Sequence, residues 1–155
     1  MKYLLAIDGS PASLQAVHWA LRQAAEGLRC EFVLVNVQEP ASLYEVVTAH
    51  DVDVIEQVRG AAGADLLKDA EALVQAAGFD FESEVAGGAP EHLIIELAEN
   101  YGCDAIVMGA RGMGSSPDDG GLGPVAQAVL DSATLPVVVV RTAADSVQDA
   151  APDEA

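Results

Sequence analysis

The segment best suited to binding chemistry is the glycine-rich stretch "GARGMGSSPDDGGLGP", which runs from Gly109 to Pro124. It lies between the apolar run "AIVM" and the helix-like run "VAQAVL". Glycine turns between a strand and a helix often hold phosphates, because their backbone N–H groups can approach an anion closely. Asp118 and Asp119 repel a phosphate, unless Mg²⁺ bridges the carboxylates to the phosphate oxygens. The segment is therefore a candidate nucleotide loop with an unfavourable charge.

Other motifs that bind phosphates or accept a phosphoryl group do not fit the sequence. A dinucleotide-binding G-x-G-x-x-G follows the first strand, whereas Gly112 and Gly114 follow a later strand and precede two serines and a proline. The G-x-x-x-x-G-K-[ST] phosphate loop is absent, because the glycine segment of this sequence contains no lysine. A phospho-receiver domain would need paired acidic residues after the first strand and a lysine late in the chain, and this sequence has neither. The weak metal-like cluster of His50, Asp51 and Asp53 is typical of a solvated acidic loop, so no metal site is predicted.

The elements that position the glycine segment alternate between short apolar runs and helical periodicity. Ser10 is expected to cap the first helix, with Pro11 at its first position. Phe79, Phe81 and Val85 alternate with acidic residues, so their strand is predicted at a sheet edge. The expected strands are residues 3–7, 30–37, 79–85, 104–109 and 135–140, and the expected helices are about 11–28, 54–77, 90–100 and 125–133.

This alternation predicts an α/β fold, in which a single doubly wound five-stranded parallel sheet carries four main helices on its two faces. Ligands of such sheets bind beyond the carboxyl ends of the strands, where the strand order reverses. The segments "IDGSP" and "MGARG" both follow strand ends. We therefore expect Asp8 and the glycine segment to be neighbours in one site.

Composition limits the partners of the chain. Its 25 acidic and 7 basic residues give a formal charge of −18 and a pI near 4.1, which argues against nucleic acid or an anionic membrane. The apolar runs are shorter than the roughly 18–20 residues that span a bilayer. Two lone cysteines, Cys30 and Cys103, favour a reduced cytoplasm. Residues 1–141 are predicted to form one domain, and the acidic residues 142–155 a disordered tail.

Three segments together resemble the universal stress protein family over about residues 2–141: "LLAIDGSPAS", "VAGGAPEHLIIELAENYGCDAIVMGARG" and "LPVVVVR". The resemblance implies a five-stranded parallel sheet with four helices, in the adenine nucleotide alpha hydrolase-like arrangement. This agrees with the independent count of elements. The resemblance also implies a cytoplasmic protein, usually a homodimer, from a family in which some members bind ATP and others do not.

The ATP-binding branch of that family carries Gly, two residues, Gly, nine residues, and then Gly followed by Ser or Thr. Gly109 and Gly112 match the opening, but the gap from Met113 to Leu122 holds ten residues and closes with Gly123 and Pro124. Proline lacks both the hydroxyl and the backbone N–H that a phosphate would bind. Each hydrogen bond to a charged group contributes about 1.5–3 kcal/mol, so a weakened triphosphate site is predicted.

The resemblance implies that Asp8 faces the ribose or adenine, that Val37 lines the adenine pocket, and that Met108 and Gly109 pass beneath the nucleotide. From the residues alone, Asp8 suits an Asx turn or helix cap equally well, and Val37 and Met108 suit a plain core. ATP or AMP is a candidate ligand and Mg²⁺ a candidate ion, with no cofactor required. The candidate nucleotide-binding residues are Asp8, Val37, Met108, Gly109, Gly112, Gly123, Pro124 and Val125.

The last strand is a candidate dimer contact. An apolar edge strand presents unpaired N–H and C=O groups that favour pairing with the same strand of a second copy. The resemblance implies the same dimer, and the alternative is an edge covered by the acidic tail. The candidate residues are Pro136, Val137, Val138, Val139 and Val140.

Taken together, these observations favour a cytoplasmic universal stress protein-like regulator or adaptor. It would have a degenerate adenine-nucleotide site and act as a homodimer on an unidentified protein partner. The alternative is a functional ATP or AMP sensor that uses Mg²⁺ and a rearranged glycine loop. Slow nucleotide hydrolysis would need a general base, and the sequence offers no residue for that role, so we do not expect an enzyme.

Overall fold

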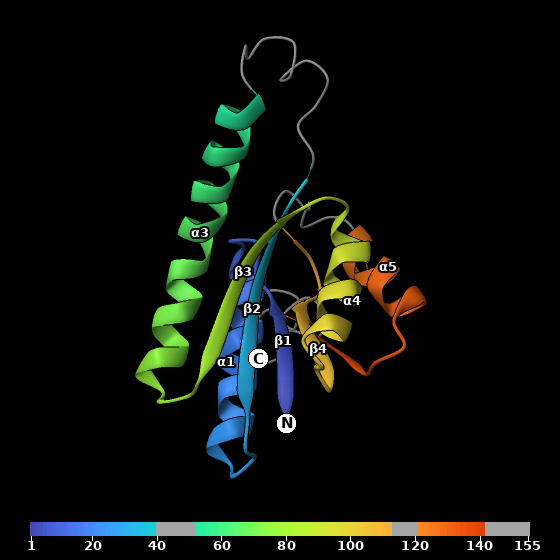
Figure 1. The fold of residues 1–155 in the computed structure, drawn as a ribbon. Coiled ribbons are helices and arrows are strands. Elements are labelled where there is room, and N and C mark those ends of the chain that lie inside the picture. Colours follow the sequence, from blue (N-terminus) through green and yellow to red (C-terminus); the bar gives the residue numbers. More distant parts are fainter. Residues whose placement is uncertain (40–51, 113–120, 142–155) are drawn as a thin grey trace, which may run out of the picture.

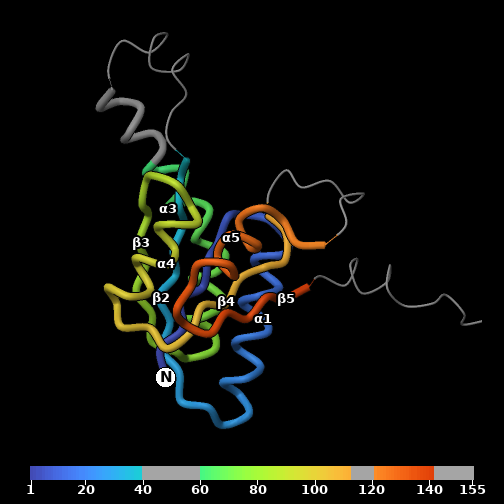
Figure 2. The backbone as a smooth tube through the Cα atoms, turned by 90° about the vertical axis from the view of Figure 1, so that its right-hand side faces the viewer, coloured from blue at the N-terminus to red at the C-terminus, as the bar shows by residue number. Residues whose placement is uncertain are grey.

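The computed structural model describes residues 1–39, 52–112 and 121–141, with residues 52–59 as helix backbone alone. Five strands form one parallel sheet in the order β3-β2-β1-β4-β5, of which Figure 1 labels the first four and Figure 2 labels β5. This confirms the predicted doubly wound α/β fold. The strands are β1 (Lys2–Ala6), β2 (Glu31–Gln38), β3 (Phe81–Gly87), β4 (Ala105–Gly109) and β5 (Val137–Val140), and the helices are α1 (Pro11–Ala25), α3 (Val52–Ala76), α4 (Pro90–Asn100) and α5 (Pro124–Ser132).

The helices cover the two faces of the sheet in pairs, with α1 and α3 on one side and α4 and α5 on the other (Figure 1). Successive side chains of a strand point to opposite faces, so the central strands supply both cores. Leu5 and Leu34 belong to the core under α1 and α3, whereas Leu4 and Val33 belong to the core under α4 and α5. Burial on both faces explains why these strands are continuous apolar runs.

Helix α1 begins as predicted, because the Ser10 hydroxyl accepts a backbone N–H of the first turn at 3.2 Å and Pro11 is the first helical residue. Its end differs from the prediction. The helix stops at Ala25, so Leu28 lies beyond it and is 38 % exposed rather than packed on the apolar stripe. Gly27 causes this ending with a φ of 108°, a conformation that terminates helices readily when glycine supplies it.

The strand predicted over residues 79–85 lies at the sheet edge, as expected, but it runs from Phe81 to Gly87. Gly78, with a φ of 83°, turns the chain back after α3. Phe79 therefore precedes the strand, and its ring packs edge-on against Phe32 with 5.8 Å between centroids. The phenylalanine belongs to the core beneath α3 instead of the ladder.

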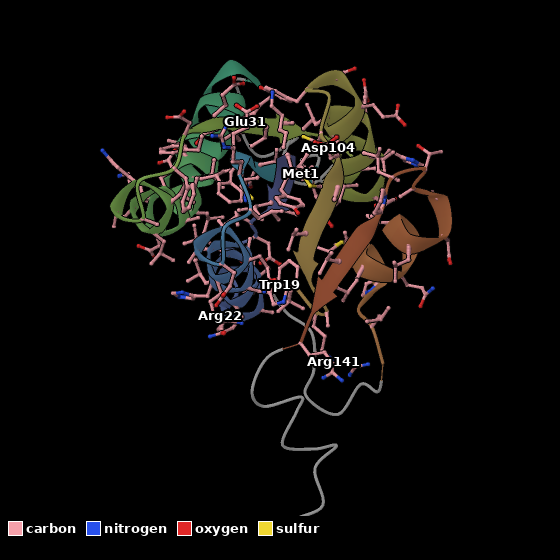
Figure 3. All side chains as sticks on the ribbon, turned by 90° about the horizontal axis from the view of Figure 1, so that it is seen from below. Met1, Trp19, Arg22, Glu31, Asp104 and Arg141 are labelled. Atoms are coloured by element: carbon pink, nitrogen blue, oxygen red, sulfur yellow. The ribbon has the colours of Figure 1, made fainter. Side chains whose placement is uncertain are left out.

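The amino ends of the strands are tied together at the end of the sheet shown in Figure 3, where Met1, Glu31 and Asp104 lie near one another. The Glu31 N–H donates to the Met1 carbonyl at 2.9 Å, and the Lys2 N–H donates to the Asp104 carboxylate at 2.8 Å. Within the described ranges, the helices are too short or too polar to cross a membrane.

The opposite, carboxyl end of the sheet contains the point where the strand order reverses. From the adjacent strands β1 and β4, the sheet grows toward β2 and β3 on one side and toward β5 on the other (Figure 2). The loops after β1 and β4 therefore leave the sheet side by side. A Cβ atom on Gly112 would lie 2.7 Å from Asp8 Oδ2, which confirms the expected proximity of Asp8 and the glycine segment.

Candidate functional site

A cleft of about 270 Å³ opens at the carboxyl ends of β1, β2 and β4, and the first turns of α4 and α5 complete its wall. Its volume lies just below the roughly 300–1,000 Å³ typical of small-molecule sites. The structure brings all the residues of the predicted nucleotide site to this cleft, namely Asp8, Val37, Met108, Gly109, Gly112, Gly123, Pro124 and Val125.

Part of the cleft wall is apolar. Val35 and Val37 lie two residues apart on β2 and so face the same side of the sheet, toward Ile94 of α4 and Met108 of β4. Val37 and Met108 also pack on the core beneath α4 and α5, so the core interpretation is correct for both residues. An apolar surface of this kind suits the flat face of an aromatic ligand.

Asp8 forms a turn and lines the cleft at the same time. Ser10 donates two hydrogen bonds to Asp8 Oδ1, one from its backbone N–H at 2.8 Å and one from its hydroxyl at 2.5 Å. These bonds form the Asx-type turn that the residues alone had suggested. They also fix the carboxylate, whose Oδ2 lies beside Gly112 at the cleft.

The two glycines that open the glycine segment have different surroundings. A Cβ on Gly109 would lie 2.9 Å from both the carbonyl carbon and the Cβ of Ala12, so β4 and α1 approach each other too closely for a side chain. At Gly112 the near atom is the carboxylate oxygen of Asp8, which belongs to a side chain. Gly109 is thus needed for packing, whereas Gly112 is exposed and leaves room beside a cleft residue.

Helix α5 begins at the cleft without a side-chain cap. Gly123 is its N-cap residue and Pro124 its first helical residue. The Gly123 N–H donates to the Ala110 carbonyl at 2.8 Å, which fixes the start of the helix against the end of β4. The first turn therefore offers neither a hydroxyl nor the N–H that proline lacks.

Polar, charged and helix-start residues that sequence reasoning did not assign to the cleft also line it, among them Ser13, Glu39, Pro90 and Arg111. Arg111 is half-buried, and its Nε donates to the Gly121 carbonyl at 3.3 Å. It is the single basic residue of the segment 109–124, a signal that the sequence analysis could have used. Ser13, Glu39 and Pro90 show no comparable signal, because only the fold brings their elements to the cleft.

Several predicted features fall outside the described residues: Asp118 and Asp119, His50 and Asp51, and the tail over residues 142–155. The Asp53 side chain is likewise not described. Among the side chains that are described, no group of three or more His, Cys, Asp or Glu residues is arranged to hold a metal ion.

The predicted dimer strand lies at the outer edge of the sheet, next to β4 (Figure 2). It begins at Val137, and Pro136 precedes it as an exposed residue whose carbonyl accepts the Ile106 N–H at 2.9 Å. All four valines of β5 are half-buried.

The chain matches the model of the universal stress protein family over residues 1–141. Among curated proteins it is similar to the universal stress protein YxiE of Bacillus subtilis, with 33% identity over 147 residues. That alignment covers 90% of this chain and 98% of YxiE.

Solved structures share the fold. The universal stress protein UspA from Lactobacillus plantarum has a TM-score of 0.77 at 22% identity, covering 91% of this chain and 97% of its own. A universal stress protein in complex with cAMP has a TM-score of 0.66 at 25% identity, covering 90% and 96%. A family member from Arabidopsis thaliana with AMP bound has a TM-score of 0.68 at 19% identity, covering 99% and 97%. The family-model match and the YxiE relative together establish that this chain belongs to the universal stress protein family.

Proposed function

We propose that this chain is a regulator or adaptor that binds an adenine nucleotide in the cleft, chiefly through the nucleoside. The observation that carries the proposal is the convergence of Asp8, Val37 and Met108 with both glycines of the "GARG" segment in one cleft. The related structures that contain cAMP and AMP support an adenine ligand. The proposal assigns no catalytic step and no required cofactor. Its setting is the cytoplasm, and its protein partner is unidentified.

The end of the proposed site that would hold the phosphates binds them more weakly than the same end does in the ATP-binding branch of the family. Pro124 starts α5 without a side-chain hydroxyl and without a backbone N–H. A hydrogen bond to a charged group contributes about 1.5–3 kcal/mol, so each missing donor weakens a triphosphate by roughly 10- to 100-fold. We therefore expect the site to bind adenosine or a monophosphate better than ATP.

Calorimetric titration of nucleotide-free protein tests this proposal, with adenosine, AMP, cAMP and ATP as ligands, each with and without Mg²⁺. We expect heats from the first three ligands and weak or no binding of ATP. If ATP binds most tightly and requires Mg²⁺, the chain is the ATP sensor of the alternative hypothesis. If no adenine ligand binds, the nucleotide proposal is wrong and a partner-binding adaptor remains.

A matched pair of proline substitutions locates the defect. Pro124→Ser restores both the hydroxyl and the N–H at the first residue of α5, and at about 10- to 100-fold for each donor we expect ATP affinity to rise by about 100- to 10,000-fold. Pro11→Ser makes the same exchange at the first residue of α1, away from the cleft lining, and should leave ATP affinity unchanged. Equal ATP affinity in both variants would show that Pro124 does not set the weakness.

We also propose that the chain forms a homodimer through β5. The four valines of this edge strand are half-buried in the monomer, and α1 packs beside them with Trp19 on the same side of the sheet (Figure 3). An edge strand leaves a row of N–H and C=O groups that a second β5 can pair by two-fold symmetry. This pairing would also cover the exposed parts of the valine side chains.

Sedimentation velocity of the wild type, Val139→Lys and Glu82→Lys tests the dimer. Val139 lies on β5, whereas Glu82 is exposed on β3 at the opposite sheet edge, so the two variants add lysine to different edges. We expect a dimer for the wild type and Glu82→Lys, and a monomer with unchanged circular dichroism for Val139→Lys. A wild-type monomer at tens of micromolar would rule out this dimer.

A further inference from the structure

We propose that Arg111 selects a single phosphoryl group on the bound nucleoside. The site would then bind a nucleoside monophosphate, open or cyclic, more tightly than either the free nucleoside or the triphosphate. This inference rests on the proposed adenine-nucleotide site and adds the charge and the size of the group that the phosphate end accepts.

The first support is the charge of the cleft lining. Among the described residues that line it, Arg111 supplies the positive charge, while Asp8 and Glu39 supply carboxylates. The surrounding chain carries a formal charge of −18, so the general field of the protein repels anions. A negatively charged ligand therefore has one favourable position among these residues, and that position is beside Arg111.

The second support is the place where the guanidinium is held. Arg111 lies two residues beyond the end of β4, and its Nε donates to the Gly121 carbonyl at 3.3 Å, just before α5. This bond holds the side chain near the start of α5, which is the phosphate end of the proposed site. A guanidinium presents five N–H donors in one plane, so the same group can donate to a carbonyl and to phosphate oxygens.

The third support is the balance of charge between ligand and site. A phosphate monoester carries a charge of about −1.5 to −2 at neutral pH, and one guanidinium neutralises roughly half to two-thirds of it. The additional phosphates of a triphosphate meet Pro124 instead of a hydroxyl donor, in a cleft that also holds the carboxylates of Asp8 and Glu39. Free adenosine gains nothing from Arg111. The single phosphoryl group is therefore the best match to this lining.

Titration calorimetry of Arg111→Gln, with Arg22→Gln as a matched control, tests the assignment. Arg22 is exposed on α1 and does not line the cleft, so its substitution removes the same charge from elsewhere (Figure 3). We expect Arg111→Gln to weaken AMP and cAMP by about 10- to 100-fold while adenosine changes by less than about 2-fold. Arg22→Gln should bind all three ligands like the wild type. AMP and cAMP distinguish an open from a cyclic phosphoryl group.

The salt dependence of AMP binding provides a readout that a purely structural role would not change. The ratio of AMP affinities between the wild type and Arg111→Gln should shrink with added salt, because salt screens the attraction between the guanidinium and the phosphate. If the wild type binds adenosine as tightly as AMP, or ATP more tightly than AMP, the inference is wrong while the nucleotide site stands. If Arg111→Gln loses adenosine as well as AMP, Arg111 is structural and the inference is again wrong. If the wild type binds no adenine ligand, the proposed function fails together with this inference.

Discussion

Gly109 and Gly112 open the glycine segment, and alanine substitutions should separate their roles. At residue 109 the new Cβ would lie 2.9 Å from the carbonyl carbon of Ala12 and 3.0 Å from its oxygen, both in the backbone of α1. Real Cβ contacts are longer, so α1 would have to move away from β4. At residue 112 the near atom is Asp8 Oδ2 at 2.7 Å, and a side chain can move more easily than a helix backbone.

These contacts predict different costs for the two substitutions. Gly109 is buried, and added atoms in a well-packed core typically cost about 1–3 kcal/mol, so Gly109→Ala should lower the free energy of unfolding by that amount. Gly112→Ala displaces Asp8 Oδ2, whereas both hydrogen bonds from Ser10 go to Oδ1 and can be kept, so the cost should be about 1 kcal/mol or less. The same displacement moves the carboxylate proposed to bind the nucleoside, so adenosine affinity should fall by about tenfold or more.

Urea unfolding at a fixed protein concentration measures the first quantity, and calorimetric titration with adenosine measures the second. Gly60→Ala is the control, because Gly60 is inside α3 and, outside its own stretch of helix, no atom of the described residues lies within 4 Å of the new Cβ. It should raise the free energy of unfolding by up to about 1 kcal/mol and leave binding unchanged. The reasoning is refuted if Gly109→Ala is as stable as Gly60→Ala, or if Gly112→Ala binds adenosine like the wild type.

Three further predictions concern the scaffold. Gly63→Ala places a Cβ 2.5 Å from a valine methyl of β3, so it should lower the free energy of unfolding in urea by about 1–3 kcal/mol. Gly60→Ala in the same helix should raise this free energy. An increase for both variants would contradict the packing described at Gly63. Burial raises the pKa of the Cys103 thiol to about 11, and the residue is only 5 % exposed, whereas Cys30 is half-buried. A thiol reagent at neutral pH should therefore label Cys30 before Cys103, as followed by mass spectrometry. Equal labelling rates for the two cysteines would contradict this prediction. Tyr101 donates a hydrogen bond to a glutamate of β3, and this bond raises the pKa of the tyrosine to about 12. The bond therefore stabilises the fold fully below pH 10.0, the ordinary pKa of tyrosine, and this stabilisation is lost as the pH rises from there to about 12. Tyr101→Phe should remove the ionisation step near pH 12 from a spectroscopic titration, and a retained step would contradict the assignment.

The fold followed from the sequence where one local signal determined each element. The continuous apolar runs at β1, β2 and β4 predict strands buried on both faces, and the structure buries both faces of these strands. Ser10 and Pro11 predict the start of α1 because cap chemistry is local. Leu28 was misplaced because Gly27 at positive φ ended α1 earlier than the apolar pattern suggested. Phe79 was misplaced because β3 begins only at Phe81, after the turn at Gly78. Periodicity indicates the element, whereas backbone conformation fixes its end.

The candidate site could be predicted only in part, for a different reason. The parallel topology brings together the loops that follow β1 and β4, so the proximity of Asp8 and the glycine segment follows from chain order alone. Ser13, Glu39 and Pro90 reach the cleft through the packing of α1, β2 and α4, which leaves no mark in any local motif. The spacing of the glycines also did not distinguish the packing role of Gly109 from the looser surroundings of Gly112.

The start of α5 lacks a phosphate donor without any cost to the helix itself. The first N–H of a helix has no partner inside the helix, so proline at that position removes nothing on which the helix depends. Pro124 therefore leaves α5 intact, and the loss falls on any ligand that would have used the N–H or a hydroxyl there. Gly109 is the opposite case, because the backbone of Ala12 excludes a side chain whether or not a ligand binds. The match of Gly109 to the glycine motif of the ATP-binding branch is thus explained by packing alone, whereas the Gly123-Pro124 pair bears on which ligands the site could hold. The departure at Pro124 should therefore outweigh the match at Gly109 in any argument about ATP.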